Sequence, residues 1–155
     1  MRRMLMILLA LALCSGVMFG FAGKALGFTW MYGSVLGFTD NYKDYEARNG
    51  FDNFSGTIYG ITEIKPMTSD AAVGELGVRP VLYEGYSYYG PWSVYELAPK
   101  FVTNTSIVSK TAPHDSYHGI TPNNWYFYYN QGIVSVSTNG LHYYYPPESP
   151  ITLAD

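Results

Sequence analysis

Cysteine and charged residues are what this sequence has least of. Of its 155 residues, one is cysteine (Cys14) and 14% are charged, against roughly 25% charged residues in an average soluble domain. A single cysteine excludes a disulfide framework and a cysteine-ligated zinc module. A hydrophobic content of 48% excludes a disordered chain. The 9 basic and 12 acidic residues also argue against a nucleic-acid binder held by charge.

Common catalytic and cofactor motifs are missing as well. The sequence contains no Gly-x-Ser-x-Gly nucleophile motif, no phosphate-binding loop and no dinucleotide fingerprint. The acidic cluster at 40–52 does not match the spacing of the twelve-residue calcium loop, because counting Gly50 as its sixth position places Tyr45 at the first. We therefore expect no cofactor.

Residues 1–22 differ from the rest of the chain. Two arginines are followed by an apolar run, and the segment ends in Gly-Phe-Ala, the pattern of a secretory signal peptide. An uncleaved anchor is the alternative, since residues 4–23 carry no charge and are long enough to span a bilayer. Lipidation at Cys14 is less favoured, because Leu13 stands where a small residue is required. We expect export, to an extracellular, cell-surface or periplasmic location, with the mature chain beginning at Gly23.

Residues 23–155 form one domain in this interpretation. Short runs rich in β-branched and aromatic residues alternate with Gly and Pro, which predicts an antiparallel β-sandwich or a small barrel. One short helix is expected from Thr39 or Asp40 to Arg48, ended by Asn49-Gly50. Asp44 and Arg48 stand four apart, which on a helix would be a supporting pair. The expected strands are 57–64, 81–89, 92–97, 106–110, 124–129, 133–137 and 141–145.

The last three strands are expected to form a meander. Asn139-Gly140 between apolar runs predicts a tight hairpin turn with positive φ at Gly140. In 133–137, Val134 and Val136 alternate with serines, so the valines should face the core.

Tyrosine is the most conspicuous residue, because 12 of the 16 lie at or after Tyr83. In 125–129 both faces of the strand are aromatic; we expect the more apolar set to be core and the other set to be exposed. On 141–145, either the odd-numbered or the even-numbered residues point outward, and the polarity of His142 favours the even set. The expected core set is Trp125, Phe127 and Tyr129, and the expected exposed binding surface is Tyr126, Tyr128, His142 and Tyr144.

Such a surface suits contact with a partner, because tyrosine combines a large flat ring with a hydrogen-bonding tip. A protein partner or self-association is the main hypothesis, a polysaccharide is the second, and cross-strand pairing without a binding role is the structural alternative. Single-stranded nucleic acid is excluded, because Lys100 and Lys110 are the only lysine or arginine side chains of 83–155.

Glu84 and Glu96 are the weak candidates for catalysis. Two carboxylates beside aromatic rings are what glycoside hydrolysis requires. A two-residue turn at Gly90-Pro91 would point them to opposite sides, whereas a three-residue loop would set them directly opposite one another. Hydrolysis of glycans is therefore the alternative to a role in binding or assembly.

His114, Asp115 and His118 are the weak candidates for a metal site. Histidines four apart share one face of a helix, and Asp115 adds an oxygen ligand. Pro113 and Gly119 bracket the segment, which favours a solvated loop. No metal is expected there.

Overall fold

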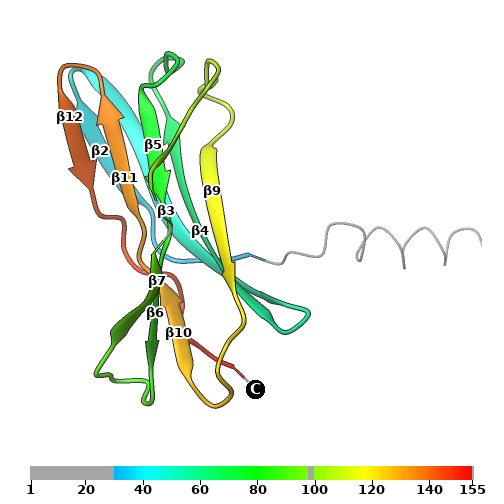
Figure 1. Ribbon diagram of the computed structural model, residues 1–155. Helices are drawn as coiled ribbons and strands as arrows, with labels where there is room; N and C mark the ends of the chain where they lie inside the picture. Colours follow the sequence, from blue (N-terminus) through cyan, green and yellow to red (C-terminus); the bar gives the residue numbers. More distant parts are fainter. Residues whose placement is uncertain (1–29, 98–99, 155) are drawn as a thin grey trace, which may run out of the picture.

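The computed structural model describes residues 30–97 and 100–154, with the backbone alone at 95–97, and these residues form antiparallel sheets (Figure 1). The strands are β1 (Met31–Tyr32), β2 (Leu36–Asp40), β3 (Lys43–Phe54), β4 (Thr57–Pro66), β5 (Leu76–Arg79), β6 (Val81–Gly85), β7 (Ser93–Leu97), β8 (Val102–Thr103), β9 (His114–Ile120), β10 (Phe127–Asn130), β11 (Ile133–Ser137), β12 (Leu141–Tyr144) and β13 (Thr152–Leu153). The expected mainly β, antiparallel class is confirmed. Within these residues there is no helix of the length and apolarity that a bilayer crossing requires. The segments 1–22 and 4–23 lie outside the described residues.

The first layer is a five-stranded sheet built around the long hairpin of β3 and β4. Strand β9 pairs with the outer edge of β4, while β1 and β2 pair with different parts of β3. Along β3 the side chains alternate, with Tyr45, Ala47 and Phe51 buried on the inner side and Glu46 exposed on the outer side. This alternation is the signature of a strand with one buried face.

The helix expected at 40–48 is wrong. Asp40 ends β2, a two-residue turn follows at Asn41-Tyr42, and β3 begins at Lys43. Both turn residues have positive φ, 44° and 65°, as the tight turns that suit twisted antiparallel strands require. Asp44 instead accepts hydrogen bonds from Thr39 and Thr68, and Arg48 forms an ion pair with Glu63 of β4.

The second layer consists of two four-stranded sheets, β12-β11-β5-β8 and β13-β10-β6-β7. Each strand of one sheet is followed or preceded in the chain by the strand at the same place in the other sheet. The four pairs are β5 and β6, β10 and β11, β12 and β13, and β7 and β8. The second layer can therefore be described as four long strands, each interrupted once. The interruptions include Pro80, Gln131-Gly132 and Pro146-Pro147, where proline removes a backbone donor from the ladder.

Two apolar clusters join the layers. One lies between the first sheet and the β12-β11-β5-β8 sheet, and the other lies between the first sheet and the β13-β10-β6-β7 sheet. The first contains Tyr45, Ala47, Ile64, Ala71, Leu76, Val78, Val134 and Val136. The second contains Phe51, Ile58, Leu82, Ile120, Tyr128 and Ala154. Burying each large side chain of these sets stabilises the fold by about 1.5–3 kcal/mol.

A buried polar network occupies the level at which the second layer is interrupted. Asn130 donates from Nδ2 to the carbonyl of Ile61 at 2.7 Å, and its Oδ1 accepts from the backbone N–H of Val81 at 3.0 Å. Asn49 Oδ1 accepts from Thr62 at 2.8 Å and from the N–H of Gly132 at 3.0 Å. The network therefore gives hydrogen-bond acceptors to the N–H groups of Val81 and Gly132 at the interruption, as buried polar groups require.

The expected meander is half correct. Strands β11 and β12 form the predicted hairpin, and φ of Gly140 is positive at 111°. Strands β10 and β11 are not paired with one another: β10 pairs with β6 and β13, whereas β11 pairs with β5 and β12. Gln131-Gly132 therefore connects β10 of one sheet to β11 of the other. The expected strand at 106–110 is also wrong, because it contributes a single bridge from Val108 to Ala71.

Candidate functional site

The outer side of the second layer carries several groups of aromatic rings, which together we call the aromatic face. Strand alternation places its residues on β6 and β10 opposite the core, since Tyr83 follows buried Leu82, and Phe127 and Tyr129 flank buried Tyr128. Its members are Tyr83, Tyr88, Trp92, Phe101, Phe127, Tyr129, Tyr143 and Tyr145.

Ring contacts organise the aromatic face. Tyr83 and Tyr129, directly opposite on β6 and β10, stack with centroids 4.9 Å apart. Trp92 packs edge-on against Tyr129 at 4.8 Å. Phe101 and Tyr143 form a second pair at 5.4 Å. Such pairs contribute roughly 0.5–1.5 kcal/mol each beyond the area they bury, so these rings are held in place before any partner arrives.

The expected binding surface on β10 is wrong, because the strand faces the other way. Tyr128 is 0% exposed, Tyr126 is partly buried against the second core cluster, and Trp125 is 74% exposed. Trp125 precedes β10 and has a positive φ of 70°, so strand alternation does not extend to it. The inward orientation of Val134 and Val136 is confirmed, with both fully buried.

The orientation of β12 also differs from expectation. His142 and Tyr144 lie opposite Val136 and Val134, on the side of the strand that faces the first layer. Tyr143 lies on the outer side. Both side chains reach across to Asp40 of β2 at the edge where the two layers meet; His142 is exposed, as expected, whereas Tyr144 is partly buried.

Asp40 is a buried carboxylate with three donors. Its Oδ2 accepts from Tyr144 OH and His142 Nδ1, each at 2.7 Å, and its Oδ1 accepts from Thr138 Oγ1 at 2.9 Å. Burial alone would raise the pKa of Asp40, but the hydrogen bonds outweigh burial and lower it. Burial and the bond to Asp40 raise the pKa of Tyr144 to about 12. The ring of Phe38 stacks on Tyr144 at 3.8 Å, so this cluster joins β2 to β12.

A groove lies on the aromatic face at the interruption between the two sheets. It has a volume of about 450 Å³, within the roughly 300–1,000 Å³ typical of small-molecule sites. Its polar side chains are an arginine, a glutamine and two tyrosines, and no carboxylate is among its lining residues. The lining residues are Arg79, Val81, Tyr83, Val94, Gln131, Ile133 and Tyr145.

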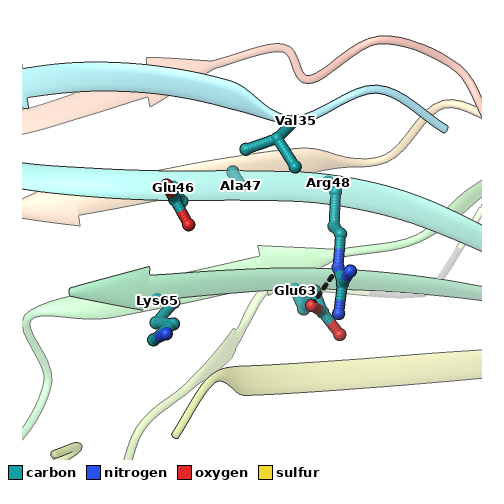
Figure 2. Close-up of a pocket in the computed structure, with 6 residues that line it drawn as sticks. All are labelled: Val35, Glu46, Ala47, Arg48, Glu63 and Lys65. Atoms are coloured by element: carbon teal, nitrogen blue, oxygen red, sulfur yellow. Dashed lines mark hydrogen bonds and ion pairs between the residues drawn. The ribbon is translucent and has the colours of Figure 1, made fainter. Parts of the chain in front are cut away.

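A second, smaller pocket of about 160 Å³ lies on the outer side of the first layer (Figure 2). Arg48 of β3 and Glu63 of β4 are directly opposite one another and form an ion pair. The guanidinium of Arg48 also lies 3.7 Å from the centroid of the Tyr32 ring, and Tyr32 OH donates to Glu63 at 3.0 Å. Burial, followed by the charge of Glu63, raises the pKa of Tyr32 to about 12. These contacts satisfy one another across the sheet, which is a stabilising role.

Glu84 and Glu96 are not cross-strand neighbours. The backbone register places Glu84 opposite Ser93 and Glu96 opposite Leu82, with an irregularity between Leu82 and Tyr83. Glu84 Oε2 accepts from Tyr128 OH at 3.2 Å, so it supports a buried tyrosine. This arrangement differs from the direct opposition that the three-residue loop predicts.

His114, Asp115 and His118 lie on strand β9, so the loop expected there is wrong. Residues four apart on a strand share a face but are separated by about 13 Å at 3.3 Å per residue, too far for one ion. His114 Nε2 lies 2.8 Å from the carbonyl oxygen of Val102. Among the described residues, no group of three or more metal-ligating side chains converges.

Comparisons with protein-family models, with curated proteins and with solved structures find no significant match to this chain. The groove residues Arg79 and Gln131 were not singled out by sequence reasoning. They stand beside Pro80 and Gly132, residues that typically end strands, and this local signal is all that the sequence carries, because the meeting of the two interruptions is decided by the fold.

Proposed function

We propose that this chain is an exported β-sandwich module that acts by binding or assembly at the cell surface through its aromatic face. The facing layers support a sandwich over a barrel. The signal-peptide pattern of residues 1–22 supports export. The observation that carries the proposal is the gathering of rings on one outer side of the molecule.

Exposure distinguishes these rings from core residues. Tyr145 is 65% exposed, and Tyr88 and Tyr143 are about half exposed. Contiguous exposed apolar surface marks interaction sites more often than chance exposure does, and tyrosine is enriched at interfaces. The rings are already packed against one another, so binding would immobilise few side chains.

The test compares the parent with its variants in two measurements. The first is how much of the exported protein stays with the cells that produce it, and the second is its sedimentation in solution. We expect the parent to remain with the cell envelope or to self-associate, and Tyr143→Ala with Tyr145→Ala to abolish that behaviour. Tyr117→Ala is the matched control, since Tyr117 is 63% exposed on β9 of the other layer. A doubly substituted protein that behaves as the parent does in both measurements would refute the proposal.

The proposed export is tested separately, by identifying the first residue of the exported protein. Sequencing the N-terminus of the protein outside the cytoplasm should return Gly23 as the first residue. Met1 would favour the uncleaved anchor, and a lipid-bearing Cys14 would favour a lipoprotein.

A further inference from the structure

We propose that the groove of the aromatic face binds a sugar unit of an uncharged polysaccharide. The inference rests on the proposed function and names its partner.

Size favours a small ligand over a protein surface. The groove is a depression at the interruption of the second layer, bounded by residues of both sheets. A stable protein contact would need roughly 800 Å² of surface on each partner. The volume of about 450 Å³ instead matches a ligand of small-molecule width.

The rings of the groove are suited to the apolar faces of a sugar. Tyr83 and Tyr145 line it together with the aliphatic side chains of Val94 and Ile133. Tyr83 is backed by Tyr129 through the stack described above, so its ring is fixed before binding. Preorganised aromatic surface lowers the entropy that binding loses.

The polar groups of the groove are suited to hydroxyls. Arg79 supplies guanidinium donors, Gln131 supplies an amide donor and acceptor, and the two tyrosines supply hydroxyls. With Arg79 as the one cation among the lining residues and a formal net charge of −3 on the chain, a polyanion is disfavoured over a neutral polymer. The pocket on the first layer lacks this chemistry, because no aromatic ring is among its lining residues and its polar side chains are all charged: Glu46 and Lys65, opposite one another on β3 and β4, and the ion pair of Arg48 with Glu63.

The experiment is a calorimetric titration of the exported protein with four neutral hexasaccharides and one anionic one. The neutral probes are the β-1,4-linked hexamers of glucose, xylose and N-acetylglucosamine and the α-1,4-linked hexamer of glucose; the anionic probe is hexagalacturonate. We expect at least one neutral hexamer to bind. Tyr145→Ala should weaken that binding about tenfold, the loss typical of an aromatic anchor, and Tyr117→Ala should leave it unchanged.

Three results would overturn the inference. The first is no binding of any neutral hexamer up to about 10 mM, roughly the weakest affinity of interest, and the second is binding confined to hexagalacturonate. The third is equal affinity of Tyr145→Ala and the parent, because the site would then lie elsewhere. If no sugar binds while the aromatic-face variants still lose retention or self-association, the proposed function stands and the partner is a protein. Circular dichroism of each variant verifies that the fold is intact.

Discussion

The burial of Tyr128 leads to the sharpest prediction about this fold. Its ring lies in the second core cluster at 0% exposure, and its hydroxyl accepts from the N–H of Asn123 at 2.9 Å and lies 3.2 Å from Glu84 Oε2. Replacing a buried aromatic side chain by alanine removes its transfer free energy and leaves a cavity. We therefore expect Tyr128→Ala to lower the free energy of unfolding by about 3–5 kcal/mol.

The conservative variant Tyr128→Phe separates the ring from the hydroxyl. It keeps the packing and leaves the Asn123 N–H without its acceptor, so we expect a loss of about 1–2 kcal/mol. Tyr145→Ala, on the exposed aromatic face, should change stability by no more than about 0.5 kcal/mol. The order of the three losses is therefore a signature of which tyrosines face inward.

Urea denaturation followed by circular dichroism measures these differences. A total stability of about 5–15 kcal/mol is typical of a domain, so the loss expected for Tyr128→Ala is a large part of it. The smaller loss expected for Tyr128→Phe keeps the comparison measurable. A loss below about 1 kcal/mol for Tyr128→Ala, with a larger loss for Tyr145→Ala, would refute the orientation of β10 described above.

Other predictions concern backbone strain, packing and pH. Gly140→Val should lower the melting temperature by about 4–8 °C, through about 1–2 kcal/mol of strain at a φ of 111°, whereas Gly37→Val, with open space around its added side chain, should not. Gly132→Ala should lower the free energy of unfolding in urea by about 2–3 kcal/mol, because an added Cβ would lie 1.8 Å from Thr62 Oγ1. Since hydrogen bonds lower the pKa of Asp40 below its ordinary 3.8, its stabilising effect is present above that value and is lost as pH falls below it. Asp40→Asn should therefore show a smaller fall in stability than the parent between pH 5 and pH 2, and an equal fall would contradict this role.

Some features of the fold follow from local chemistry and were predictable. The turn at Asn139-Gly140 was recognised because few residues tolerate its backbone conformation. The strand 133–137 was recognised with its bounds and its buried face, because Val134 and Val136 alternate with polar residues. In such a segment the sequence period of two is enough to identify both the strand and its inward side.

Local chemistry was misleading where one sequence pattern is compatible with both a helix and a strand. Asp44 and Arg48 are four apart and suggested a helical pair, yet both belong to β3, where Arg48 pairs with Glu63 on the neighbouring strand. Long-range pairing overrode the helical signals, because the inward side chains of β3 bury apolar surface that a short exposed helix would leave in water.

The sequence by itself determined the β class, the last hairpin and the abundance of rings on the second half of the chain. Tertiary structure alone decided which rings face solvent, since both sides of 125–129 are aromatic and alternation then carries no information. It also decided that Asn49 and Asn130 are buried, because their partners are backbone and side-chain groups far away in the chain. The groove has the same origin: Arg79, Gln131 and Tyr145 come together only when separate interruptions of the strands meet at one level of the folded layer.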